Sequence, residues 1–243
     1  MSSETKNKKL RIVAGPNGRG KSTIIRELQK QYNLGIFLNA DEIQFKINQN
    51  GFLDYSYYLD RTINNADWIL FLDQNDRISS QNLRLLHFNE YHITTKNKLD
   101  GYDAAIIADF LRSFLLEEDK TFTFETVFSH PSKLDLIRSA KKQGFKIYYY
   151  FICTVDPMIN VKRVKSRVLQ GGHNVDFEKI RSRYYRSLQL MYDAFMLSDR
   201  AFIMDTTYEE SDIIVEKNAS EITLHTDIIP TWVNEYLLKH LEE

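Results

Sequence analysis

The sequence predicts an α/β fold in which helices flank a mostly parallel sheet. Short apolar segments alternate with amphipathic segments along most of the chain, and this alternation is typical of βαβ units with parallel strands. Three of the four prolines, Pro131, Pro157 and Pro230, stand directly before amphipathic stretches, where proline suits the first position of a helix. The chain is 43% hydrophobic and 27% charged, which excludes a disordered chain, a collagen and a coiled-coil rod.

Each expected element follows from its own periodicity. The sequence predicts strands at residues 10–14, 35–38, 122–125, 146–154 and 201–204, and helices at 21–32, 41–47, 131–143, 157–170, 176–197 and 230–241. A hairpin is expected from residues 213–216 and 221–225, turning around Lys217-Asn218. Residues 51–100 do not follow the alternation and are interpreted as a helical insertion. We therefore expect a single domain over residues 1–243, with a C-terminal hairpin and helix at 211–243.

Composition limits the location and the partners of the chain. Its 32 basic and 33 acidic residues give a net charge of −1, so no overall basic excess indicates a nucleic-acid-binding protein. The longest apolar run, at residues 147–153, is far shorter than the roughly 20 residues of a membrane helix. The polar stretch at residues 1–9 predicts no signal peptide. The single cysteine, Cys153, lies in an apolar strand, which favours a reducing, cytoplasmic location.

The strongest motif is a phosphate-binding loop. Residues 15–22 read Gly-Pro-Asn-Gly-Arg-Gly-Lys-Ser and match the pattern G-x-x-x-x-G-K-[ST] between a predicted strand and a predicted helix. This order turns backbone N–H groups and the start of the helix toward an anion. We expect Lys21 to contact the β- and γ-phosphates of ATP and the Ser22 hydroxyl to ligate Mg²⁺. The predicted nucleotide-binding residues are Gly15, Pro16, Asn17, Gly18, Arg19, Gly20, Lys21, Ser22 and Thr23.

Other motifs narrow the class of phosphate-loop protein. Residues 97–100 spell the N-K-x-D of a GTPase, but no buried apolar strand precedes them and D-x-x-G does not occur. The L-S-G-G-Q segment of transporter ATPases is also missing, and the strand at 122–125 ends in one carboxylate rather than the Asp-Glu pair of motor ATPases. The pattern therefore favours a kinase whose hydroxyl substrate lies beside the phosphate loop.

Two strand ends supply candidate catalytic groups for such a kinase. Asp41 follows the second predicted strand, and parallel sheets place ligands beyond such strand ends. Asp41 is our candidate general base, although an aspartate there could also be the N-cap of the next helix. Glu125 and Thr126 end the next strand and could bind the acceptor hydroxyls or a water on Mg²⁺, or form a solvated strand end.

A basic lid region is expected at residues 160–190. It holds eight basic and two acidic residues around Gly171-Gly172-His173. Arg163 and Arg167 are four residues apart and share a helix face, from which guanidinium groups could stabilise charge on the transferred phosphoryl group. The region could instead be a solvated basic helix or could track nucleic-acid phosphates. His173 could bind phosphate or be an ordinary loop histidine.

Five segments together resemble the zeta toxin family of phosphate-loop kinases over about residues 10–206. They are residues 14–23 (AGPNGRGKST), 39–42 (NADE), 125–129 (ETVFS), 171–175 (GGHNV) and 180–184 (IRSRY). The resemblance implies a nucleoside-kinase-like parallel five-stranded sheet flanked by helices, with ATP and Mg²⁺ as cofactors. It also implies phosphorylation of a small-molecule hydroxyl, that of UDP-N-acetylglucosamine in the characterised toxins, and an antitoxin partner of a toxin–antitoxin pair.

The same resemblance assigns roles to individual residues. Asp41 would be the base, Glu125 and Thr126 would hold substrate, and Arg167 and Arg163 would reach the γ-phosphate. The arginine that the toxins carry two residues beyond the strand-end threonine is replaced, since Phe128 and Ser129 lie there.

The insertion leaves the acceptor open. The sequence between Asp41 and Glu125 is longer than the corresponding segment expected in the compact relatives. The aromatic residues of the insertion could stack on a base or sugar or pack against the sheet. These residues are Phe52, Tyr55, Tyr57, Tyr58 and Trp68. Two alternative functions remain, a kinase for a nucleoside or a polynucleotide 5′-hydroxyl and a non-enzymatic ATP-binding protein.

Overall fold

The computed structural model describes residues 8–18, 20–75, 78, 80–169, 175–208 and 211–242. The chain divides into two compact units, where the sequence predicts one domain. The first unit contains residues 1–34 and 123–243, and the second contains residues 35–122. No helix in the described part of the chain is long and apolar enough to cross a membrane.

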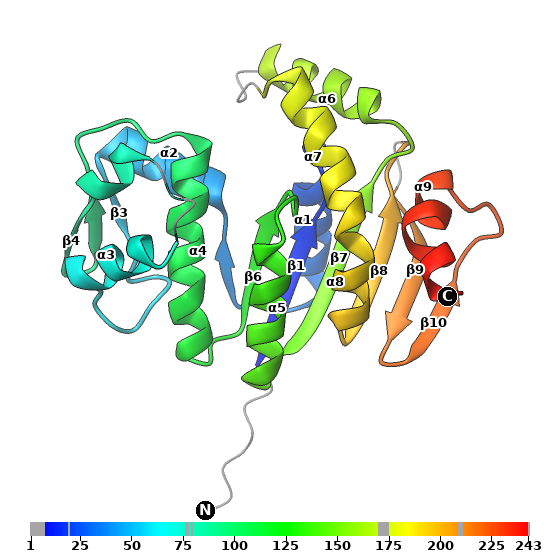
Figure 1. The fold of residues 1–243 in the computed structure, drawn as a ribbon, viewed down its shortest axis with the longest axis horizontal. Coiled ribbons are helices and arrows are strands. Elements are labelled where there is room, and N and C mark those ends of the chain that lie inside the picture. The colour runs from blue at the N-terminus through cyan, green and yellow to red at the C-terminus, as the bar shows by residue number, and fades with distance from the viewer. Residues whose placement is uncertain are drawn as a thin grey trace, which may run out of the picture. The chain divides into compact units, whose positions relative to one another are not determined.

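The first unit is built on one large sheet, shown in Figure 1. Its strands pair in the order β10-β9-β8-β7-β1-β6. They are β1 (Lys9–Ala14), β6 (Phe122–Thr126), β7 (Lys146–Cys153), β8 (Arg200–Asp205), β9 (Asp212–Asn218) and β10 (Glu221–Leu224). β7 is parallel to both β1 and β8, whereas β9 and β10 add an antiparallel hairpin at the edge. The predicted α/β class with a mostly parallel sheet is confirmed.

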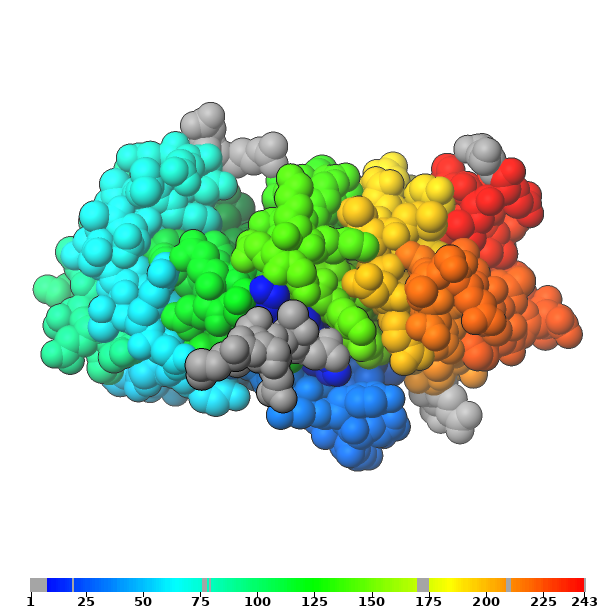
Figure 2. Space-filling model, turned by 90° about the horizontal axis from the view of Figure 1, so that it is seen from below, coloured from blue at the N-terminus to red at the C-terminus, as the bar shows by residue number. Residues whose placement is uncertain are grey.

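Helices cover both faces of this sheet. α1 (Lys21–Gln31) and α5 (Ser132–Lys142) lie on opposite sides of β1 (Figures 1 and 2). The other helices are α6 (Pro157–Leu169), α7 (Phe177–Gln189), α8 (Met191–Leu197), and α9 (Thr231–Val233), which continues through a π turn (Asn234–Leu238) into α10 (Lys239–Leu241). The long helix predicted at 176–197 is two helices, because the chain bends at Leu190.

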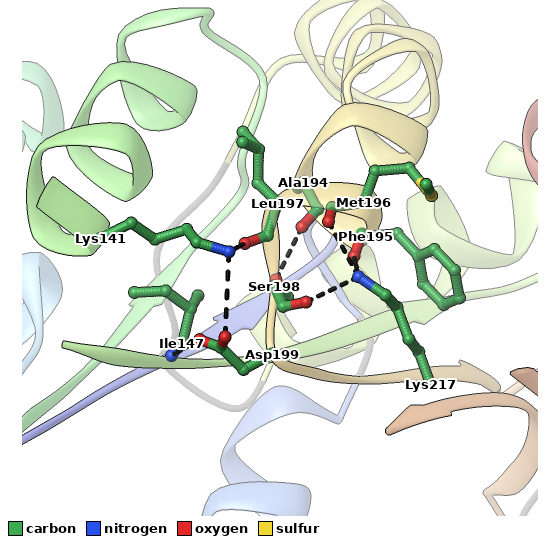
Figure 3. Close-up of polar contacts among 9 residues, drawn as sticks. All are labelled: Lys141, Ile147, Ala194, Phe195, Met196, Leu197, Ser198, Asp199 and Lys217. Carbon is green, nitrogen blue, oxygen red and sulfur yellow. Dashed lines mark hydrogen bonds and ion pairs between the residues drawn. The ribbon is translucent and has the colours of Figure 1, made fainter. Parts of the chain in front are cut away.

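Two lysines terminate α8 (Figure 3). Lys217 Nζ donates hydrogen bonds to the carbonyls of Phe195, Met196 and Ser198 at 3.0, 2.8 and 2.7 Å. Lys141 Nζ donates to the carbonyl of Leu197 at 2.7 Å. The last carbonyls of a helix lack the N–H partners that a further turn would supply. Here β9 and α5 supply side-chain donors to them, and the Phe195 carbonyl also accepts from the Ser198 N–H at 3.2 Å. Lys217 is thus a buried strand residue, and the hairpin turns at Ala219 and Ser220 rather than at Lys217-Asn218.

The second unit combines helices with a small antiparallel sheet. It contains β2 (Ile36–Leu38), α2 (Ala40–Asn50), α3 (Asn65–Asp73), a 3-10 turn (Gln81–Leu85) and α4 (Gly101–Glu117). Its sheet pairs β3 (Phe52–Asp54), β5 (His92–Thr94) and β4 (His87–Asn89) in that order. Residues 51–100, predicted as a helical insertion, therefore also contain three strands, each of which is too short to show an alternating pattern.

Aromatic packing forms the core of the second unit. The Trp68 ring lies 4.9 to 5.7 Å from the rings of Phe71, Phe88 and Phe110. Tyr55 and Tyr58 are also buried. Of the aromatic residues singled out in the insertion, these buried ones pack in the core, whereas 67% of Tyr57 and 39% of Phe52 remain exposed.

Candidate functional site

The backbone of the phosphate loop requires glycine at its first position. Gly15 has a φ of 138°, and a Cβ there would lie 2.1 Å from the Ile152 carbonyl oxygen in β7. Gly18 has a φ of 78°, and a Cβ there would lie 3.0 Å from the Asn160 carbonyl oxygen in α6. The loop is therefore packed against the neighbouring strand and against α6, with no room for larger residues at Gly15.

The loop leads into α1, whose N-terminus has no side-chain cap. Gly20, with a φ of 72°, is the N-cap of α1, so no side chain caps this helix. The Gly20 carbonyl accepts from the N–H groups of Thr23 and Ile24 at 2.9 and 3.1 Å, and no acidic residue lies in the first turn. Free N–H groups and the positive end of the helix dipole favour an anion here. Ser22 and Thr23 are exposed on this turn.

Lys21 lies across the loop and is buried. Its Nζ donates to the carbonyl oxygens of Gly15 and Pro16 at 2.9 and 3.2 Å, and lies 3.7 Å from Glu125 Oε1. The structure therefore brings together two predicted site residues that are far apart in the sequence. An ammonium held by two carbonyls and one carboxylate can move its hydrogen bonds to phosphate oxygens.

The two predicted residues at the end of β6 have different settings. Glu125 faces Lys21, whereas the Thr126 hydroxyl accepts from the N–H of Phe128 at 3.1 Å. Phe128 is buried and has a φ of 58°, a conformation that is uncommon for a bulky residue. Thr126 thus stabilises the turn that follows Glu125.

Asp41 lies in the first turn of α2 in the second unit, and its carboxylate is not the helix cap. The side chain of Asn39 accepts from the Asp41 N–H at 2.8 Å, so Asn39 is the N-cap. This corrects the alternative interpretation of Asp41 as the cap. Asp41 is exposed, and within the described residues its carboxylate forms no ion pair.

The two predicted lid arginines differ in their surroundings, since one is held by backbone carbonyls and the other is exposed. Arg163 Nη2 donates to the carbonyls of Thr207 and Tyr208 at 3.2 and 3.5 Å, which ties α6 to the segment after β8. Arg167 is exposed near the end of α6. Valine and isoleucine side chains, including Val161, Val164 and Ile180, pack α6 against α7. Arg19, Gly171, Gly172 and His173 lie outside the described residues.

One polar cluster at the end of β8 received no role in the sequence analysis. Asp205 Oδ2 accepts from the Trp232 indole N–H at 3.0 Å, and Asp205 Oδ1 accepts from the Thr207 N–H at 2.6 Å. The Thr207 hydroxyl accepts from the Val155 N–H at 3.0 Å. No spacing in the sequence indicated that Trp232 meets Asp205, because the pairing depends on how α9 folds back onto the sheet.

The residues at the loop fit a nucleotide with a divalent cation. The glycine cradle supplies N–H donors, Lys21 supplies a cation and Ser22 supplies a hydroxyl ligand. Within the described part of the chain, the buried side-chain atoms Asn17 Oδ1 and Asn160 Nδ2 have no hydrogen-bond partner, so both retain capacity for a ligand or water. Fold and loop together define an α/β protein with a phosphate-binding loop.

Comparisons of the sequence with known proteins assign no family to this chain. No protein-family model matches the chain. An uncharacterized protein of Haemophilus influenzae is 30% identical over 87 residues, which are 36% of this chain and 62% of that protein. The chain therefore spans less than two thirds of this relative.

Solved structures share the fold at low sequence identity. The AvrRxo1-ORF1:AvrRxo1-ORF2 structure with sulphate ions is 14% identical, with a TM-score of 0.58, over 93% of this chain and 63% of that chain. The structure of the same complex with ATP is 14% identical, with a TM-score of 0.56, over 92% of this chain and 62% of that chain. A structure of the PezAT chromosomal toxin–antitoxin system of Streptococcus pneumoniae is 13% identical, with a TM-score of 0.54, over 97% of this chain and 80% of that chain. The fold that the zeta toxin resemblance implies is confirmed.

Proposed function

We propose that this protein is an Mg²⁺- and ATP-dependent kinase that transfers the γ-phosphoryl group of ATP to a hydroxyl of a small molecule. The observation that carries the proposal is the position of Lys21 across the glycine loop, with Glu125 beside it. A similar fold in the AvrRxo1 complex has been described with ATP, which supports ATP as the nucleotide.

The loop residues would hold the nucleotide and the metal. The N–H groups of the loop and of the first turn of α1 would bind phosphate oxygens, and Lys21 would exchange its carbonyl partners for the β- and γ-phosphates. The Ser22 hydroxyl would be a ligand of Mg²⁺. When bound there, Mg²⁺ would neutralise negative charge on the phosphate groups.

The transfer itself would rest on residues at two strand ends. Asp41 would accept the proton of the acceptor hydroxyl at a carboxylate oxygen. Glu125 would orient the acceptor, with Thr126 fixing the turn behind it. Arg167, with His173, would stabilise negative charge on the phosphoryl group. We do not extend this role to Arg163, because its guanidinium is held by the carbonyls after β8.

The surface of the second unit bears on the acceptor. Phe45 lies one helical turn after Asp41 in α2 and is 62% exposed, and Tyr57 is 67% exposed. Exposed rings can stack on the face of a base or a sugar. The second unit also holds 14 acidic and 8 basic residues, a charge that disfavours a polyanionic acceptor such as a polynucleotide.

We therefore propose a ring-containing small molecule as acceptor, with UDP-N-acetylglucosamine as the first candidate and a nucleoside as the second. UDP-N-acetylglucosamine is proposed because the sequence resembles the zeta toxins. A nucleoside is proposed because the exposed rings could stack on its base. By the same resemblance we propose a cytoplasmic location and an antitoxin-type protein partner, which the toxin–antitoxin structure with a similar fold supports.

Mass spectrometry of a reaction with Mg-ATP and UDP-N-acetylglucosamine tests the function. We expect a product heavier by one phosphoryl group, lost in Asp41→Asn and retained in Glu42→Gln, which removes the neighbouring exposed carboxylate. Transfer only to nucleosides in a parallel screen would reassign the acceptor. ATP binding without transfer to any hydroxyl compound would contradict the kinase and favour a non-enzymatic ATP-binding protein.

A further inference from the structure

Hydrogen bonds connect the C-terminal helix to the end of β8. The Trp232 indole N–H donates to Asp205 Oδ2 at 3.0 Å, and both residues are buried. The other carboxylate oxygen of Asp205 accepts from the Thr207 N–H at 2.6 Å. A buried carboxylate that accepts two such bonds holds both donors in place, because losing either donor removes the hydrogen bond of one buried carboxylate oxygen.

The same chain of contacts continues to the phosphate loop. The Thr207 carbonyl accepts from Arg163 Nη2 at 3.2 Å, and the Thr207 hydroxyl accepts from the Val155 N–H at 3.0 Å. Arg163 belongs to α6, which lies directly against the loop. A Cβ built on Gly18 would be 3.0 Å from the Asn160 carbonyl oxygen and 3.4 Å from Arg163 Cβ.

All of these links lie within the first unit. They run from Trp232 through Asp205, Thr207 and Arg163 to Gly18. The first three links are hydrogen bonds, and at the last link α6 is so close to Gly18 that an added Cβ would lie 3.4 Å from Arg163 Cβ. Trp232 itself is buried against Phe151, whose ring centroid is 6.0 Å away. Its hydrogen bond to Asp205 is the first link of this path.

We propose that Trp232 and Asp205 are positioning residues for nucleotide binding. They anchor Thr207, Thr207 anchors Arg163, and Arg163 holds α6 against Gly18, so that the C-terminal helix sets the affinity of the phosphate loop for ATP. This inference rests on the proposed function, since it assigns a control to the same loop. It also accounts for the hydrogen bonds of Arg163 to the carbonyls after β8.

A positioning role differs from a purely structural one in what it changes. Lys217 provides the matched control, because its Nζ binds the carbonyls at the end of α8 and none of these three hydrogen bonds reaches a residue of the path from Trp232 to Gly18. Loss of Lys217 should lower the melting temperature without changing nucleotide affinity. Loss of the Trp232 hydrogen bond should change nucleotide affinity.

Calorimetric titration of the full chain with Mg-ATP tests the proposal. Trp232→Phe keeps the aromatic packing and removes the N–H, and we expect the Kd for Mg-ATP to rise about three- to tenfold, the effect of one buried hydrogen bond. Lys217→Met should leave the Kd unchanged. The KM for the acceptor should stay constant in Trp232→Phe. Asp205→Asn provides a second variant if Trp232→Phe does not fold.

A double-mutant cycle then tests the path. Arg163→Met should raise the Kd, Arg163→Lys should restore part of the affinity, and Trp232→Phe added to Arg163→Met should raise it little further, because residues in one network are not additive. An unchanged Kd in Trp232→Phe and Asp205→Asn, or an equal rise in Lys217→Met, would overturn the inference alone. Absence of Mg-ATP binding by the unsubstituted chain would instead overturn the proposed function, and the inference with it.

Discussion

Lys21 Nζ lies 3.7 Å from Glu125 Oε1, and the two groups come from the first residue of α1 and from the end of β6. Both side chains are mostly shielded from water, with 8% and 19% exposed. In this arrangement the lysine has a carboxylate and two backbone carbonyls where the proposed function puts phosphate oxygens. Under the proposed function, Glu125 would therefore compete with the nucleotide for the same ammonium group.

This competition predicts opposite effects of one substitution on binding and on catalysis. Glu125→Gln removes a negative charge beside the phosphates, so the Kd for Mg-ATP should fall severalfold, while kcat should decrease because the acceptor loses a ligand. Titration calorimetry and steady-state kinetics measure the two quantities. Glu27→Gln on the exposed side of α1 is the control and should change neither. Weaker Mg-ATP binding in Glu125→Gln would contradict the competition.

Two glycines of the loop should respond differently to alanine. Gly15→Ala places a Cβ 2.1 Å from the Ile152 carbonyl oxygen, so β1 and β7 must separate, and we expect a loss of at least about 2 kcal/mol in the free energy of unfolding. Gly20→Ala meets no atom within 4 Å, so only its left-handed backbone is strained, at about 1–2 kcal/mol. Urea unfolding of both variants tests the order, and a larger loss in Gly20→Ala would contradict it.

The cap of α2 should matter for Asp41. Asn39→Ala removes the side-chain acceptor of the Asp41 N–H, which should lower the free energy of unfolding by about 1 kcal/mol. Because Asp41 lies in the turn that Asn39→Ala leaves without its cap, kcat should fall by a larger factor than the KM for ATP rises. Asn39→Asp keeps an acceptor at the cap and should retain activity. If Asn39→Ala turned over at the rate of the unsubstituted chain, the cap would have no role in placing the base.

Lys217 should affect stability in a pH-dependent way. Burial, with a smaller contribution from Lys141, holds the pKa of Lys217 below its ordinary 10.5, while Asp199 opposes this shift. Between the folded pKa and 10.5, Lys217 binds more protons in the unfolded chain than in the folded chain. The free energy of unfolding therefore rises as pH rises through that window and falls as pH falls.

Lys217→Met tests this expectation. It leaves three carbonyls without their common donor and should cost about 1–3 kcal/mol near neutral pH. The difference in unfolding free energy between the two proteins should be larger at pH 10 than at pH 8. Chemical denaturation at both pH values measures it, with exposed Lys30→Met as the control. A difference that shrinks with pH would show that hydrogen bonding to the carbonyls, and not burial, dominates the titration.

The sequence by itself determined the α/β class and the phosphate loop. The loop motif is local, since a strand, a turn of glycines and a helix start follow one another within a few residues, and backbone geometry fixes Gly15, Lys21 and Ser22 in relation to one another. The alternation of apolar and amphipathic segments was sufficient for the mostly parallel sheet, because its longer strands and its helices span enough residues to show their period.

The tertiary structure decided which distant side chains meet. Glu125 reaches Lys21 because β6 lies beside β1 in the sheet, and Trp232 reaches Asp205 because the C-terminal helix returns to the end of β8. The three-residue strands β3, β4 and β5 and the break between α7 and α8 at Leu190 were not predicted. Strand order, short pairings and buried polar contacts depend on the whole chain being packed, and no window of sequence contains that information.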